Sequence, residues 1–265
     1  MALRTGGASG TQISQLSQLA LQFVMATAPA IQLAREMFSG DNRRPTIALI
    51  TSAVCLSGWN AVGNYSFWLK QLAADGALAN EPNTSAAVAS LVSSVVLLGI
   101  VPLLVTKFVI GDRLSDYGIR WGSLRLTFVF VAAFAPLIIA IGYFSAQSPE
   151  IRQFYPLDPH ACRSASALTW HLVGQLFWYA GWEFHFRGFL QHAIEKKSGL
   201  ATGICVQTLA STLAHFGHPS AEVFGAIAGG LLWGALAWRT RSILAGFCQH
   251  WLLGASLDFF IFWTP

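Results

Sequence analysis

The hydrophobic pattern of this chain is a series of long apolar runs separated by short polar stretches. A run of about 20 apolar residues can cross a bilayer as a helix, whereas strands of a membrane β-barrel alternate in polarity over about ten residues. The pattern therefore predicts an all-α, polytopic transmembrane helical bundle of about seven to eight spans. Seven spans are expected, at residues 46–65, 86–106, 126–145, 166–189, 200–216, 221–238 and 242–263.

The segment before these runs has a different character. Gln15, Gln18 and Gln22 recur at spacings of three and four, which is typical of one face of a helix. Residues 15–34 are therefore expected to form either an eighth span or an amphipathic helix on the membrane surface. The glutamines, and Pro29 directly after a cleavage-like Ala-Thr-Ala, argue against a signal peptide. We divide the chain into a membrane-associated segment, 1–45, and one transmembrane domain, 46–265.

Composition and charge agree with this class. The chain is 54% hydrophobic and 11% charged, whereas a soluble domain is about a quarter charged. Its net charge of +4 is small and spread over loops, which argues against a nucleic-acid partner. Basic residues accumulate in cytoplasmic loops of membrane proteins. Seven spans put four basic clusters on that one side: Arg35, Arg43 and Arg44; Lys107, Arg113, Arg120 and Arg125; Lys196 and Lys197; and Arg239 and Arg241.

The four cysteines show no C-x-x-C spacing, and Cys55, Cys205 and Cys248 fall within predicted spans. A thiol in such a position is usually a small apolar side chain. We therefore expect neither a disulfide nor a metal site from the cysteines.

Two charged residues interrupt the fourth span. Glu183 and Arg187 are four residues apart, so they share one helix face and can pair, with Gly188 beside them for close approach. Each charge in a span costs about 2.5–3.5 kcal/mol even on insertion scales, and ionisable groups there usually serve function. The alternative is a structural ion pair that locks two helices together.

Histidines and carboxylates in the later spans could complete a site. His215 lies at the end of a predicted helix, and His218 and Glu222 follow it as candidates for the rim. His250 precedes Asp258 by eight residues, which is about 80° of helix rotation, so the two share a broad face. A carboxylate, an arginine and two histidines in a membrane bundle suggest a site that handles water or protons.

Further histidines leave another option open. His185 faces roughly away from Glu183 and is interpreted as packing within the bundle. His171, His185, His215 and His250 could in principle supply paired ligands for haem b, although no spacing demands it. The chain would then be a redox membrane protein.

Three groups in this order resemble the motifs of the CAAX protease and bacteriocin-processing family of intramembrane endopeptidases. They are Trp182-Glu183-x-x-x-Arg187-Gly188, Ser211-x-x-x-His215 and His250-x-x-x-Gly254. The likeness covers roughly residues 110–260, including Phe154-Tyr155-Pro156, and is greatest for bacterial members with W-E-F-x-F-R-G. Three positions depart from the family pattern. Trp182 stands at its first glutamate, Ser211 at its phenylalanine, and Gly254 at its Asn or Asp, which leaves Asp258 as a substitute one turn on.

The resemblance implies an intramembrane endopeptidase of the bacterial inner membrane that cleaves a membrane-associated protein or peptide. Glu183 would activate water, His215 would orient it, and His250, with Asp258, would stabilise the oxyanion. Arg187 would keep Glu183 ionised.

Two alternatives qualify this prediction. Family members have been described as zinc enzymes and as metal-free, and Glu183, His215 and His250 could bind zinc. We expect no cofactor, because Glu183 cannot easily be both ligand and base. The departures at Trp182, Ser211 and Gly254 also allow a non-catalytic membrane protein that binds peptides in the same polar cavity.

Overall fold

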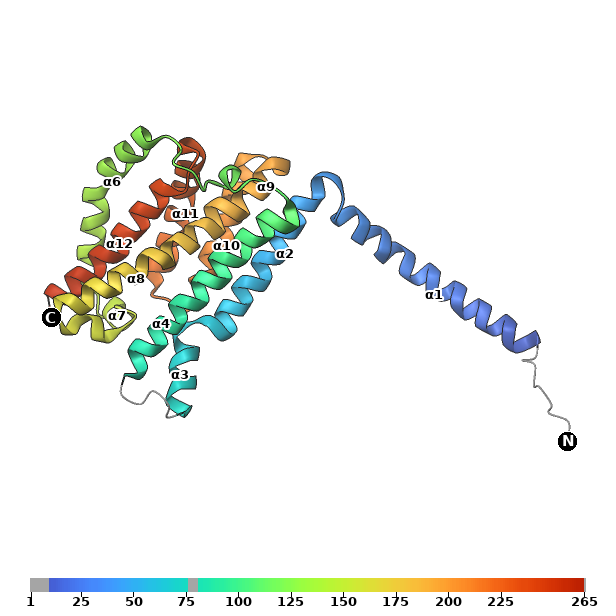
Figure 1. Ribbon diagram of the computed structural model, residues 1–265, viewed down its shortest axis with the longest axis horizontal. Coiled ribbons are helices and arrows are strands. Elements are labelled where there is room, and N and C mark those ends of the chain that lie inside the picture. The colour runs from blue at the N-terminus through green and yellow to red at the C-terminus, as the bar shows by residue number, and fades with distance from the viewer. Residues whose placement is uncertain (1–9, 76–80, 265) are drawn as a thin grey trace.

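The computed structural model describes residues 10–75 and 81–264, and Figure 1 shows them as a helical bundle with one helix extending from it. The helices are α1 (Gly10–Met37), α2 (Arg43–Gly58), α3 (Tyr65–Asp75), α4 (Pro82–Ser94), α5 (Val101–Leu104), α6 (Leu124–Ser145), α7 (Pro149–Arg152), α8 (Ala165–Glu183), α9 (Gln191–Ser198), α10 (Leu200–Ala214), α11 (Ser220–Thr240) and α12 (Leu244–Trp263). π-helical segments continue several of them: η2 (Trp59–Gly63), η3 (Val95–Ile100), η4 (Val105–Ile110) and η7 (Phe184–Leu190). The described residues contain no strand, so the predicted all-α class is confirmed.

Each of the seven predicted spans falls on a helix, but not all are equally apolar. Four helical segments are long and apolar enough to cross a membrane: Gly40–Ala73, Pro82–Ile110, Leu124–Ser145 and Ser220–Thr240. The helix α10 is apolar but short. The helices α8 and α12 carry Glu183, His250 and Asp258, and these polar residues lower their mean hydropathy. They occupy the interior of the bundle, where polar groups can be paired.

The outside of the bundle is apolar, as a membrane protein requires. Large side chains are widely exposed there, including Phe108, Phe128, Phe177 and Phe224, each with at least 60% of its surface accessible. Apolar patches of this extent are rare on soluble monomers. The chain is therefore a polytopic membrane protein whose outer surface suits lipid.

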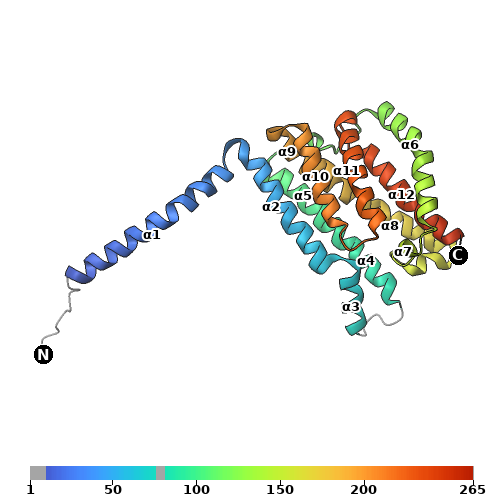
Figure 2. The same ribbon diagram turned by 180° about the vertical axis from the view of Figure 1, so that it is seen from behind.

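The helix α1 is separate from this body and extends away from it in both views (Figures 1 and 2). It covers the predicted 15–34 segment as one helix but is not among the four candidate spans. The division of the chain at residue 45, and the choice between an eighth span and a surface helix, stay predictions.

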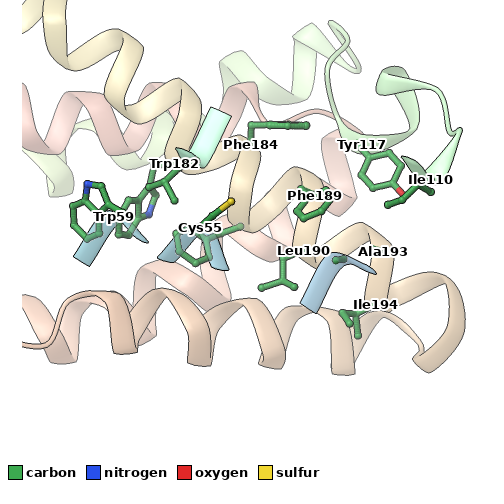
Figure 3. Close-up of a cluster of buried hydrophobic side chains, with 13 residues drawn as sticks. Cys55, Trp59, Ile110, Tyr117, Trp182, Phe184, Phe189, Leu190, Ala193 and Ile194 are labelled. Atoms are coloured by element: carbon green, nitrogen blue, oxygen red, sulfur yellow. The ribbon is translucent and has the colours of Figure 1, made fainter. Parts of the chain in front are cut away.

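The core surrounds one continuous helix made of α8, η7 and α9. Every residue from Gly181 to Gln191 in this helix is buried. Figure 3 shows side chains of η7 and α9 packed with residues of α2 and η2, with Trp59 beside Trp182 at one end and Tyr117 at the other. Gly188 permits the approach of the Tyr117 loop, because a Cβ there would lie 2.6 Å from the Tyr117 carbonyl oxygen. The charged residues of the fourth span thus lie at the centre of the bundle.

The helix α11 carries two rows of glycines at a spacing of four: Gly225 with Gly229, and Gly230 with Gly234. The second row packs against a neighbouring helix. A Cβ at Gly230 or Gly234 would lie within 2.8 Å of side chains on α10, so these two glycines let α10 and α11 approach closely. Gly225, in the other row, faces open space.

The predicted basic clusters meet at one end of the bundle. Asp112 accepts a hydrogen bond from Arg44 Nε at 2.8 Å and from Tyr117 Oη at 2.9 Å, and Lys196 Nζ lies 3.4 Å away. The hydrogen bond from Arg44 holds the pKa of Asp112 down at about 2, so this carboxylate is charged at any physiological pH. Arg120 Nε donates to the Arg241 carbonyl at 2.6 Å, which brings the last cluster to the same end.

This arrangement predicts the topology of the protein. With the native cysteines replaced, Lys197→Cys and Arg239→Cys should both be protected from a membrane-impermeant maleimide in intact cells and react after permeabilisation, since basic ends are cytoplasmic. Lys70→Cys, near the opposite end, is the control and should react in intact cells. Labelling of the first two positions from opposite sides would contradict the predicted number of spans between them.

Candidate active site

Polar residues recur at every fourth position along the central helix. They are His171, Gln175, Tyr179, Glu183 and Arg187, and residues at this spacing form a stripe that winds slowly around the helix. The helix α12, which packs against α8, presents Gly246, His250, Gly254 and Asp258 at the same spacing. The two helices therefore meet along a ladder of polar side chains and glycines.

The central rung of this ladder is formed by Glu183. Its Oε1 lies 2.8 Å from His250 Nδ1 and 3.1 Å from Arg187 Nη1, so the predicted pairing of Glu183 with Arg187 is present. Its Oε2 has no hydrogen-bond partner among the described residues. A Cβ at Gly246 would lie 2.7 Å from Oε2, so glycine is what allows α12 to approach the carboxylate. The Glu183 side chain is 0% exposed and is stabilised by these two partners.

His250 is held on both faces of its ring. It stacks on Trp233 with ring centroids 4.2 Å apart, and Tyr179 lies 4.4 Å away on the side of α8. Trp233 is fixed in turn by a hydrogen bond from its Nε1 to Gln249 Oε1 at 3.0 Å. Because Glu183 is an acceptor when ionised, His250 Nδ1 carries the hydrogen, and Nε2 of the neutral ring is left as an acceptor.

Trp182 lies between the two histidines of the predicted site. Its ring centroid is 5.2 Å from that of His215 and 6.4 Å from that of His250. It also contacts Trp59 edge-on at 6.0 Å. The position that carries the first glutamate in the resembled family therefore does face both histidines, but here it holds an indole.

His215 belongs to a second polar cluster. Its Nδ1 lies 2.7 Å from the Ser211 carbonyl oxygen, and its Nε2 lies 3.8 Å from Glu222 Oε1. Glu222 Oε1 also lies 2.9 Å from His218 Nδ1. The residues predicted for the rim, His218 and Glu222, are thus grouped with His215, and the Trp182 ring contacts both His215 and His250.

Tyr155 completes the second cluster by donating a hydrogen bond from its hydroxyl to Glu222 Oε1 at 2.8 Å. Burial raises the pKa of Tyr155 well above its usual value, and the nearby Glu222 carboxylate raises it further, so this hydroxyl keeps its proton. In the sequence, Tyr155 is notable only within Phe154-Tyr155-Pro156, as part of the family likeness, with no sign of its link to Glu222.

Asp258 forms a third cluster rather than supporting His250. Its Oδ2 lies 3.0 Å from His171 Nε2 and accepts a hydrogen bond from Gln175 Nε2 at 2.6 Å. His250 and Asp258 are eight positions apart on α12, with Gly254 midway between them, so each meets a different part of α8. Sequence reasoning missed Gln175, although its spacing of four from His171 and Tyr179 was a visible signal.

A cavity of about 690 Å³ lies beside these clusters. Its inner wall includes Trp59, Trp178 and Tyr179, whose rings contact Trp182 or His250 or lie next to rings that do. Its outer part is formed by residues 153–158 and 216–218, at the end of the bundle opposite the basic clusters. Its walls thus combine aromatic rings with polar groups, as is typical of ligand sites.

The arrangement does not fit a zinc site made of Glu183, His215 and His250. Glu183 Oε1 and His250 Nδ1 contact each other, so neither atom is available to a metal ion. The Trp182 ring lies against both His250 and His215. Across residues 10–75 and 81–264, no group of three or more His, Cys, Asp or Glu side chains is placed to hold a metal ion.

Three of the four histidines considered for haem have a ring nitrogen engaged elsewhere, and the fourth is buried among phenylalanines. His171 faces Asp258, His250 faces Glu183, and His215 faces the Ser211 carbonyl. His185 is 0% exposed and packs against Phe186 and Phe189, in keeping with a packing role. The redox alternative thus gains no support from these contacts.

Comparison with known proteins gives one match. Residues 164–256 match the family model described as Type II CAAX prenyl endopeptidase Rce1-like. This segment runs from the start of α8 into α12 and contains Glu183, Arg187, His215 and His250. No match was found among curated proteins or among solved structures. The chain is thus similar over these residues to a family of membrane proteases, which supports the relationship indicated by its motifs.

Proposed function

We propose that this protein is an intramembrane endopeptidase that cleaves a membrane-associated protein or peptide. The observation that carries the proposal is the buried pair of Glu183 Oε1 and His250 Nδ1, 2.8 Å apart, behind the wall of a cavity. Arg187 supplies a positive charge 3.1 Å from this carboxylate in an apolar interior. The match of residues 164–256 to a protease family supports the same class.

In this geometry Glu183 and His250 act together as the general base that takes a proton from water. Glu183 orients the imidazole and stabilises the positive charge that His250 acquires on taking a proton at Nε2, which is how a carboxylate assists histidine in hydrolases. A water molecule would lose its proton to this pair as its oxygen forms a bond to the peptide carbonyl carbon. Collapse of the tetrahedral intermediate breaks the C–N bond, and the proton passes to the leaving nitrogen. His215, with Nδ1 on the Ser211 carbonyl, has Nε2 free to accept a hydrogen bond that orients water or substrate.

The position of the cavity indicates where the substrate enters. Its outer part lies at the end opposite the basic clusters, so with those clusters in the cytoplasm it opens toward the other side of the membrane. We therefore propose a bacterial inner-membrane enzyme whose substrate presents an extended segment on the outer side. The aromatic wall of Trp59, Trp170 and Trp178 suits large apolar side chains of that segment.

A reconstituted system tests this function and the role of metal together. The purified protein in liposomes, mixed with membrane-anchored reporter peptides, should release a fragment, and the rate should be unchanged after dialysis against EDTA. Cleavage that is lost on dialysis and restored by zinc would contradict the metal-free mechanism. No cleavage of any reporter would instead favour a second function.

That second function is peptide binding without catalysis. The specific observation in its favour is Trp182, which places an apolar ring between His215 and His250 where the resembled family has a glutamate. A binding protein of this kind would retain labelled peptides in the cavity without altering them.

A further inference from the structure

Tyr179 has no polar partner on α12, unlike His171, Gln175 and Glu183, which contact Asp258 or His250. It lies one turn before Glu183, and its ring is 4.4 Å from that of His250. The residue opposite it is Gly254, and a Cβ there would lie 2.1 Å from the Tyr179 hydroxyl oxygen. The hydroxyl therefore fills the space that any side chain at position 254 would need.

Position 254 is one of the defined positions of the family motif that this chain resembles. The third motif of that family carries Asn or Asp four residues after its histidine, and here that position is glycine. The structure shows what replaces the missing polar side chain: a hydroxyl that reaches the same place from the facing helix. The Tyr179 hydroxyl thus places a polar group at the point that a side chain at position 254 would occupy.

The Tyr179 hydroxyl is available for a ligand. Three other tyrosine hydroxyls are engaged, since Tyr65 donates to Asn83, Tyr117 to Asp112 and Tyr155 to Glu222, and Tyr143 is exposed on the outside of the bundle. Tyr179 has no hydrogen bond to any described residue, is only partly buried, and lines the 690 Å³ cavity. A phenol beside a cavity usually finds a partner, which here can come from a bound molecule.

The proposed hydrolysis needs a hydrogen-bond donor for the oxyanion that develops on the peptide carbonyl. In neutral His250, Nδ1–H is directed to Glu183 and Nε2 is an acceptor, so the imidazole cannot donate to a developing oxyanion while it serves as base. Arg187 is turned to Glu183 and is 4% exposed. Tyr179 lines the cavity, its ring lies 4.4 Å from that of His250, and its hydroxyl, beside Gly254, can donate a hydrogen bond.

We propose that Tyr179 is a catalytic residue whose hydroxyl donates a hydrogen bond to the carbonyl oxygen of the scissile peptide bond. The inference rests on the proposed endopeptidase function. The hydrogen bond strengthens as the C=O electron pair moves onto oxygen, and no proton is transferred. Removing one such donor from a hydrolase typically lowers kcat about 100- to 1000-fold.

The test is Tyr179→Phe in the liposome assay, which keeps the ring contact with His250 and removes only the hydroxyl. We expect kcat to fall about 100-fold or more with little change in KM. Tyr143→Phe, the same change at a tyrosine outside the site, should match the wild type. A wild-type kcat for Tyr179→Phe, or a change confined to KM, would overturn the proposal.

A rescue experiment separates the hydroxyl from the packing of the ring. Tyr179→Ala should lose activity, and adding Gly254→Asn should restore part of kcat, because the new side chain enters the vacated space. Gly254→Asn alone should fail, since it would collide with Tyr179. A wild type that cleaves nothing overturns the endopeptidase function and this inference together, whereas an active wild type with equally active Tyr179→Phe overturns this inference alone.

Discussion

Replacing Glu183 by glutamine should abolish cleavage while leaving membrane insertion intact. Glutamine keeps the shape of the side chain and can still contact His250, but it has no charge to stabilise a protonated imidazole. The comparable change in a serine protease lowers kcat about 10⁴-fold. The rate of fragment release by Glu183→Gln in liposomes, set against its thermal unfolding in detergent, measures the two effects separately.

Glu195→Gln is the matched control, because it makes the same change further along the same continuous helix. It should cleave at the wild-type rate. Arg187→Ala should behave differently from both, since removing one partner of a buried ion pair strands the other at a cost of about 3–5 kcal/mol. We expect Arg187→Ala to reduce the yield of folded protein as well as activity. A wild-type rate for Glu183→Gln would refute the assignment of Glu183 to the base.

Much of this fold follows from the pattern of the sequence. Apolar runs of sufficient length predicted the long helices of the bundle body but not α3, α7 or α9, and the four basic clusters predicted which helix ends lie together. The contacts of Asp112 with Arg44 and Lys196 confirm that two of those clusters meet. The spacing of four between Glu183 and Arg187 was enough to predict their pairing, because helix geometry alone decides it.

The sequence could not predict which residues of α8 contact which residues of α12. Spacing within α12 showed that His250 and Asp258 share a face, but it could not show which residues of α8 they meet. A shift of one turn between the two helices would have put Asp258 opposite a different residue. The register is set by close packing, in particular by Gly246 against Glu183 and Gly254 against Tyr179, and such contacts depend on the whole bundle.

The sequence also could not predict which neighbours the adjacent side chains of Trp182 and Glu183 would face. Trp182 and Glu183 are adjacent and differ by about 100° around the helix. The structure shows that Trp182 faces His215 and the cavity wall, while Glu183 faces His250 and Arg187. The residue at the usual position of the family's first glutamate is therefore the one that lies between the histidines, and that placement leads to the most informative substitution.

Trp182→Glu should change the pH dependence of cleavage more than its maximum rate. A carboxylate at this position would stand near Glu183, and two close carboxylates resist being charged together, so the acidic limb of the pH–rate profile should move to higher pH. Loss of the indole also removes contacts with Trp59 and His215, and emptying a buried tryptophan site costs about 3–5 kcal/mol.

Trp182→Gln separates these two effects, because it loses the same ring and gains no charge. It should be less stable than the wild type but keep the wild-type pH profile, while Trp182→Glu should be equally unstable with a shifted profile. The measurement is cleavage of one membrane-anchored reporter by the three proteins from mildly acidic to mildly basic pH. If the wild type and Trp182→Gln are inactive throughout while Trp182→Glu cleaves, the natural protein is a peptide-binding relative. Glu183 would then be a structural partner of Arg187 and His250 rather than part of the base.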